Sequence, residues 1–138
     1  MLEQTGEGRA QGPRVLSDAD LVAFAASTDL DAAAAFYGGV LGLELVDSTP
    51  FAKVFDANGT QLRVTRVDAV AGAAYTVLGW RVEDLDAAVA ALRSRGVEPL
   101  RYEGMEQDDS GAWTAPGGSR IAWFADPEGN TLSLQQAP

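Results

Sequence analysis

The feature of this 138-residue sequence that most constrains its fold is an internal duplication. The letters DLDAA occur twice, at positions 29–33 and 84–88, an offset of 55. A second pair of similar segments, FDANGTQLRV and FADPEGNTLSL, aligns Gly59 with Gly129 at an offset of 70. The chain is therefore predicted to contain two copies of one plan, in which a strand and a helix precede three further strands.

Each half has one predicted helix. A Ser-Thr-Asp run supplies candidate caps for the first helix, and its Ala-rich body is expected to end at Gly38 and Gly39. The second, within VEDLDAAVAALRSRGVE, has arginines near its C-terminus and Gly96 as its stop.

The predicted strands are short, alternate in character and are joined by ANG and DPEG turns. This pattern is typical of mixed sheets that rest one face on a helix and leave the other face free. The strands are expected at residues 21–26, 43–47, 51–55 and 60–67 in the first half, and at 75–82, 97–102, 120–124 and 131–135 in the second.

The length suits one compact domain. The second half inserts a Gly-rich, acidic loop at 103–119, and loops of this length usually act as lids or are disordered. The expected boundaries are a flexible N-terminal tail at 1–17 and a single domain at 18–138, composed of module one (18–67), a linker (68–74) and module two (75–138).

Composition excludes several classes of function. With no cysteine there are no disulfides, and with no histidine the commonest general base and transition-metal ligand are absent. The formal charge of −10 and the scattered Lys and Arg argue against nucleic-acid binding. The N-terminal region has no apolar run typical of a signal peptide or membrane span, so we expect a cytoplasmic protein without membrane contact.

Three segments carry a family resemblance: DLDAAAAFYGGVLGLEL, RVEDLDAAVAALRSRGVE and WFADPEGNTLSL. They resemble the vicinal oxygen chelate superfamily, which contains glyoxalase I, extradiol dioxygenases, fosfomycin-resistance thiol transferases and bleomycin-resistance binding proteins. The resemblance covers the chain from about Leu21. It implies an α+β fold in which two βαβββ modules form a curved mixed sheet with a concave pocket.

In members that use a metal, the ligands lie on the first and last strand of each module. Carried over by resemblance, these positions fall on Val22, Arg63, Val77 and Ser133. Valine has no donor atom, arginine is a fixed cation, and a lone serine is a weak ligand. The chain therefore resembles the branch of the superfamily that lacks metal ligands, and we expect neither a metal ion nor another cofactor.

If these four positions face the cavity, strand alternation also defines the rest of each face. The cavity side would then hold Phe24, Ala26, Gln61, Thr65, Gly79, Thr131 and Gln135. The helix side would hold Leu62, Val64, Leu78, Trp80, Leu132 and Leu134.

Three of the candidate site residues have competing interpretations. Arg63 is either a cation that fixes an anionic or carbonyl-bearing ligand, or an ordinary solvated or ion-paired arginine. Trp113 is either a lid or pocket-wall residue or packs the loop onto the sheet. The resemblance places Trp123 along the cavity, whereas a core position is the simpler alternative. The candidate ligand-binding residues are Val22, Phe24, Arg63, Val77, Trp113, Trp123 and Ser133.

These features favour metal-independent binding of a small organic molecule, with antibiotic sequestration as the version that has family precedent. The enzymatic alternative is a metal-independent lyase or isomerase acting on a carbonyl-containing small molecule, with Arg63 as electrophile and Tyr102 or a carboxylate as acid or base. A third hypothesis, an interaction module without a ligand, predicts a fully packed concave face. The resemblance also implies a homodimer in which modules of two chains complete each cavity.

Overall fold

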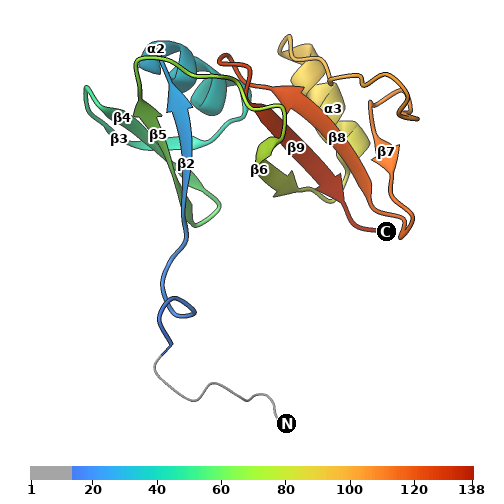
Figure 1. The fold of residues 1–138 in the computed structure, drawn as a ribbon, viewed down its shortest axis with the longest axis horizontal. Helices are drawn as coiled ribbons and strands as arrows, with labels where there is room; N and C mark the ends of the chain where they lie inside the picture. The colour runs from blue at the N-terminus through green and yellow to red at the C-terminus, as the bar shows by residue number, and fades with distance from the viewer. Residues whose placement is uncertain (1–13) are drawn as a thin grey trace.

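The computed structural model describes residues 14–138 and contains two βαβββ modules, each with a four-stranded mixed sheet (Figure 1). Module one comprises β2 (Val22–Ser27), α2 (Leu30–Ala33), η1 (Ala34–Val40), β3 (Glu44–Ser48), β4 (Ala52–Ala57) and β5 (Thr60–Arg66). Module two comprises β6 (Thr76–Arg81), α3 (Leu85–Ser94), β7 (Trp113–Thr114), β8 (Arg120–Ala125) and β9 (Thr131–Gln136). Residues 1–13 of the predicted tail lie outside the described residues.

The two sheets have the same topology, with strand orders β2-β5-β4-β3 and β6-β9-β8-β7. The predicted α+β class and the repeated module are therefore confirmed, although the strands form two separate sheets. No helix among residues 14–138 is long and apolar enough to cross a membrane.

The pairing of strands confirms the duplication residue by residue. In each sheet the first strand runs parallel to the last, so that Phe24 pairs with Arg63 and Gly79 pairs with Ser133. Gly79 follows Phe24 by 55 positions, and Ser133 follows Arg63 by 70. These are the two offsets found in the sequence, so the two modules place equivalent residues side by side.

The first helix begins as predicted but ends later. Asp29 caps α2, because its Oδ1 accepts hydrogen bonds from the backbone N–H groups of Asp31 and Ala32. The helix then continues as the π-helix η1 through Gly38 and Gly39, so the prediction that these glycines end it is wrong. Adjacent buried aromatic side chains anchor η1 in the core, and such packing outweighs the weak helix propensity of glycine.

The predicted strand at 97–102 is also wrong. This segment lies beside β8, but its one backbone hydrogen bond to that strand runs from Leu100 N–H to the Trp123 carbonyl. Pro99 has no N–H to donate to a ladder, and Tyr102 N–H bonds to the Gln107 side chain. The fourth strand of the sheet is instead β7, from within the inserted loop, which pairs with β8.

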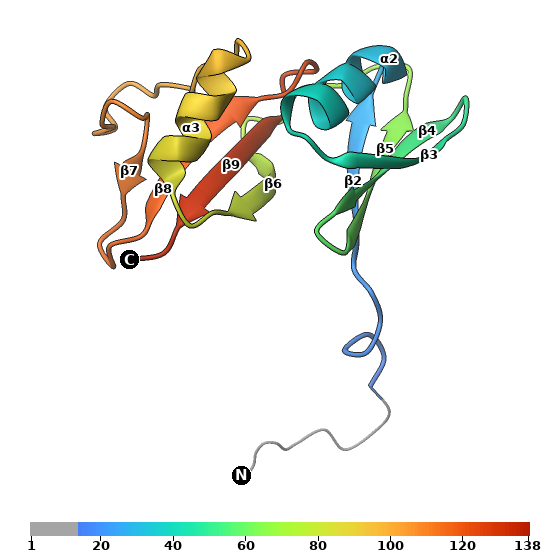
Figure 2. The same ribbon diagram turned by 180° about the vertical axis from the view of Figure 1, so that it is seen from behind.

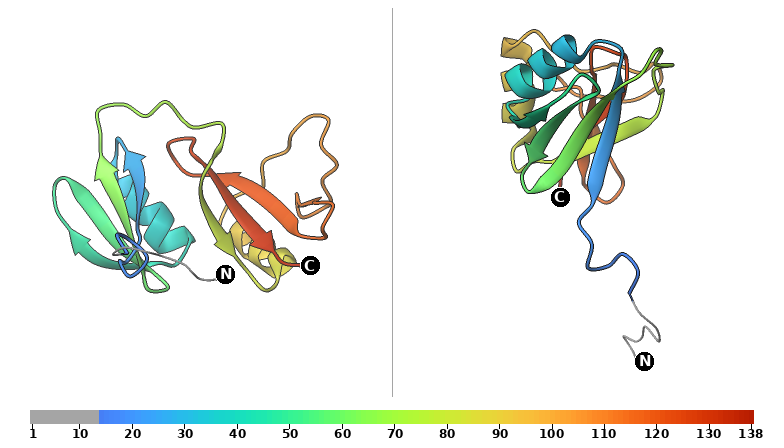
Figure 3. Two further views of the ribbon diagram at one scale, coloured as in Figure 1. Left: turned by 60° about the horizontal axis from the view of Figure 1, so that its bottom comes forward. Right: turned by 90° about the vertical axis from the view of Figure 1, so that its left-hand side faces the viewer.

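One hydrophobic core joins the two modules. Both helices lie on the same side of the sheets (Figures 2 and 3). The rings of Phe36, from η1, and Phe124, from β8, meet across the module boundary with centroids 6.5 Å apart. Leu62 on β5 and Leu132 on β9 are almost completely buried in the same cluster.

Candidate functional site

Each sheet has one face against the helices and one face away from them, which we call the open face. The predicted division between the two faces is confirmed for the helix side. Leu62, Val64, Leu132 and Leu134 are buried in the core, and Trp80 packs against it from a partly buried position.

The open face of module one combines apolar side chains with a cation. Val22 is 38% exposed and Phe24 is 60% exposed, so this face is not covered within one chain. Arg63 lies between Phe24 on β2 and Val54 on β4. It is half-buried, and no carboxylate of residues 14–138 lies within ion-pairing distance of it.

Carboxylates line the outer part of this face. Asp56 pairs with Glu44 across β3 and β4, and Asp47 pairs with Val54, so all three acidic residues share the face of Arg63. The open face of module one is therefore acidic on β3 and at Asp56 of β4, apolar on β2, and basic at Arg63 on β5.

The open face of module two is aromatic. Trp123 lies opposite Ser133, and the ring of Tyr102 meets that of Trp123 edge-on, with centroids 5.6 Å apart and an interplanar angle of 84°. Trp113 pairs with Ile121, two residues along β8 from Trp123, and so lies on the same face. We call Tyr102, Trp113 and Trp123 the aromatic platform.

Gly79 lies beside the aromatic platform, opposite Ser133. A Cβ atom at Gly79 would lie 2.6 Å from the hydroxyl oxygen of Ser133, closer than real Cβ contacts allow. The absence of a side chain at Gly79 therefore leaves room for the Ser133 hydroxyl beside Trp123.

Val77 lies where the two modules differ. The register of β6 and β9 shifts between Thr76 and Leu78, so that Thr76 pairs with Thr131 and Val77 has no partner. Val77 packs against the core cluster, unlike its sequence equivalent Val22. Val22 pairs with Gln61, whose equivalent at the offset of 70 is Thr131. Thr131 pairs with Thr76, so Thr76 takes the place of Val22 in the register of module two.

Hydrogen bonds hold the inserted loop that carries part of the platform. The Gln107 side chain accepts from Tyr102 N–H and donates to the carbonyls of Leu100 and Gly111. Trp113 lines a hollow of about 430 Å³ with this loop. Gln107 therefore ties the segment before the loop, which bears Tyr102, to Gly111, two residues before Trp113.

An ionic cluster fixes the outer end of the same loop. Arg120 donates to Asp86 on α3 at 2.8 Å and to Asp108 in the loop at 2.7 Å. Hydrogen bonds to Asp86 and then to Asp108 raise the pKa of Arg120. Desolvation raises the pKa of Asp108, but hydrogen bonds from Arg120 and the backbone outweigh it, and the net pKa is lowered.

The DPEG turn joins the two modules. Buried Asp126 accepts hydrogen bonds from the N–H groups of Glu128 and Asn130, from the Asn130 amide and, at 2.8 Å, from the hydroxyl of Tyr37 on η1. Burial, followed by the hydrogen bond to Asp126, raises the pKa of Tyr37. The Glu128 carboxylate reaches back to Thr28 N–H at 2.8 Å, and this bond is the main cause that lowers the pKa of Glu128. Asp126 therefore organises the turn, and Tyr37 and Thr28 tie it to module one.

The structure pairs some of the predicted site residues and separates others. Phe24 pairs with Arg63 on module one, and Trp123 pairs with Ser133 on module two. Tyr102, proposed as an acid or base for a carbonyl polarised by Arg63, lies on the other module from that arginine. The role of Gly79 was missed, although its 55-residue offset from Phe24 identified it as an equivalent position.

Donor chemistry at the four positions expected from the metal-using pattern remains poor. Within the described residues, no three His, Cys, Asp or Glu side chains gather closely enough to hold a metal ion. Val22, Arg63 and Ser133 lie on open faces and contribute one hydroxyl between them. The residues present therefore do not fit a metal site of the expected kind.

Comparisons with known proteins identify the fold and the family. The sequence profile of the Glyoxalase/Bleomycin resistance protein/Dioxygenase superfamily matches residues 21–134. No match was found among functionally curated protein sequences.

Three solved structures illustrate the similarity. A glyoxalase family protein from Bacillus anthracis has a TM-score of 0.71 at 16% identity, covering 91% of this chain and 100% of that one. TnmS3, an antibiotic-binding protein from Streptomyces sp. CB03234, has a TM-score of 0.66 at 22% identity, covering 91% and 100%. The fosfomycin resistance protein FosX from Listeria monocytogenes has a TM-score of 0.67 at 17% identity, covering 86% and 92%.

These structural matches establish the shared fold, and the profile match extends over most of the chain. Together with the paired modules, they show that the protein belongs to the Glyoxalase/Bleomycin resistance protein/Dioxygenase superfamily.

Proposed function

We propose that this protein binds a small organic molecule on the open faces of its sheets, without a metal ion and with a second copy of the chain covering the site. The observation that carries the proposal is the aromatic platform beside Ser133 and Gly79. Aromatic walls with a few polar groups are typical of small-molecule sites. The exposed Phe24 on the other module supports a site that one chain leaves incomplete.

The side chains of the open faces favour a particular ligand chemistry. Tyr and Trp rings stack with planar aromatic groups and attract cations to their faces. Glu44, Asp47 and Asp56 add negative charge on module one, and the whole chain has a formal charge of −10. We therefore favour planar aromatic or cationic natural products, and antibiotic sequestration is the biological role that fits these ligands. The antibiotic-binding protein TnmS3 has the same fold.

Metal independence is supported by the donor chemistry of the four expected positions. A chelator should leave binding unchanged, and metal analysis of the purified protein should find less than one equivalent. A stoichiometric, tightly bound metal would contradict this part of the proposal.

The binding test uses planar aromatic antibiotics and cationic glycopeptides, measured by thermal shift and isothermal titration calorimetry. Trp123→Ala should weaken binding of a bound compound by about five- to 150-fold, because stacking on an aromatic ring contributes roughly 1–3 kcal/mol. Phe51→Ala is the matched control, since Phe51 is an aromatic residue in the β3–β4 connection and is 72% exposed. Failure of the whole panel to bind, or equal binding by Trp123→Ala and wild type, would contradict the proposal.

A further inference from the structure

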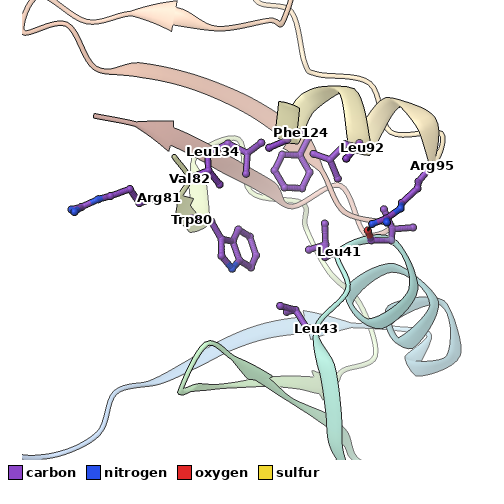
Figure 4. Close-up of a pocket in the computed structure, with 12 residues that line it drawn as sticks. Leu41, Leu43, Trp80, Arg81, Val82, Leu92, Arg95, Phe124 and Leu134 are labelled. Atoms are coloured by element: carbon purple, nitrogen blue, oxygen red, sulfur yellow. Dashed lines mark hydrogen bonds between the residues drawn. The ribbon is translucent and has the colours of Figure 1, made fainter. Parts of the chain in front are cut away.

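An apolar cavity lies on the helix side of the sheets, opposite the open faces. It has a volume of about 270 Å³ and lies between the end of η1 in module one and the helix-facing side of module two. Figure 4 shows apolar side chains around it from both modules. Its walls include Leu41, Leu43, Trp80, Leu92, Phe124 and Leu134.

This cavity is open to solvent on one side, and its lining is mostly apolar. Apolar cavities of about 150 Å³ already bind small apolar guests, and this one is larger. At roughly 30 Å³ per water-sized group, this space has room for about nine non-hydrogen atoms. Filling it would remove Trp80 and the surrounding leucines from water.

One cation is available at the edge of this cavity. Arg95 reaches from the end of α3 toward η1, and its Nη1 donates to the Val40 carbonyl at 2.7 Å (Figure 4). A guanidinium has five N–H donors, and no carboxylate of residues 14–138 lies within ion-pairing distance of this one. By contrast, Arg93 is paired with Glu98.

The second arginine that borders the cavity has a different orientation. Arg81 pairs with Gln135 on the open face, and its guanidinium points away from the cavity in Figure 4. The cavity therefore combines apolar walls with one exposed cation at its rim, Arg95, in a protein whose net charge is −10.

We propose that this cavity binds a small amphipathic carboxylate, with its hydrocarbon part against the apolar walls and its carboxylate on Arg95. An eight-carbon fatty acid has ten non-hydrogen atoms and its anionic end can leave the cavity toward the guanidinium. Hydrogen bonds between an arginine and a carboxylate are charge-assisted, and therefore stronger than hydrogen bonds between neutral groups. This site uses neither open face, so it is independent of the function proposed above.

Octanoate is the probe, with octylamine and octanol as ligands of matched chain length and different head groups. Titration calorimetry on the full chain should detect octanoate, with octanol weaker and octylamine weakest. Arg95→Gln should weaken octanoate binding by about tenfold or more, whereas Arg81→Gln should leave it unchanged. Trp123→Ala should also leave it unchanged, which separates this site from the aromatic platform.

A second variant protects the test against loss of folding at Arg95. Ala91 is exposed on α3 and borders the cavity, so Ala91→Leu should obstruct the site while circular dichroism remains that of the wild type. Octanoate binding should then be lost. The proposal is overturned if octanoate does not bind, if it binds all variants equally, or if Ala91→Leu weakens self-association instead, which would make a second copy of the chain the occupant.

Discussion

At the scale of single residues, the buried carboxylate of Asp126 both organises its own turn and links that turn to module one. It accepts four hydrogen bonds, three from its own turn and one from Tyr37. A buried charge is tolerated only when such bonds replace water. The sequence identified this segment as a turn, but Tyr37 is 89 positions away, and no local pattern indicates that pairing.

Tyr37→Phe tests this contact. The ring can keep its packing, but Asp126 loses one donor, so the free energy of unfolding should fall by about 1.5–3 kcal/mol. Urea denaturation followed by circular dichroism measures the change. Tyr75→Phe is the control, because Tyr75 is 74% exposed and its substitution should alter stability by less than about 0.5 kcal/mol. Equal stability of the two variants would show that the Tyr37 hydroxyl is not needed.

At the scale of elements, the two modules differ most at the strand beside β8. The duplication predicts a strand directly after α3, but a proline in that segment and a side-chain contact from Gln107 leave it with one backbone bond to β8. The loop instead returns as β7 and brings Trp113 to the open face. Sequence patterns predicted the strand from its apolar alternation, and could not show which of two segments would pair.

Gln107→Ala tests whether this glutamine holds the loop. It removes one accepted and two donated hydrogen bonds, so amide hydrogen exchange should become faster from residue 100 to 114 while α3 stays protected. Binding of any platform ligand should weaken as Tyr102 becomes mobile. Glu103→Ala, at an exposed position outside the hollow that Trp113 lines, should leave both measurements unchanged. Equal exchange rates over residues 100 to 114 in wild type and Gln107→Ala would show that other contacts hold the loop.

At the scale of the whole molecule, the repeated plan was predictable because two independent offsets reported the same duplication. The faces of the strands were also predictable, because period-two alternation places Leu62 and Leu132 in one core. The shift at Val77 was not predictable, because one unpaired residue changes the register without changing the apolar pattern. The cavity beside Arg95 also depends on how the modules pack, which neither half specifies alone.

The exposed apolar residues of the open faces predict self-association. We expect sedimentation equilibrium at micromolar concentration to give twice the chain mass of 14.5 kDa. Phe24→Glu replaces an exposed apolar side chain of the uncovered face with a charge and should shift the protein toward monomer. Phe51→Glu, in the β3–β4 connection, should remain dimeric. A monomeric wild type would contradict the shared site and leave the platform to act within one chain.

The core that crosses the module boundary has a further consequence. Phe36 and Tyr37 are encoded in the first half, but they contact Phe124 and Asp126 in the second. Each half therefore contributes side chains that pack against the other half. Two fragments made by dividing the chain within 68–74 would therefore depend on each other to fold. Because they would fold only when they meet, such fragments could serve as the halves of a split reporter.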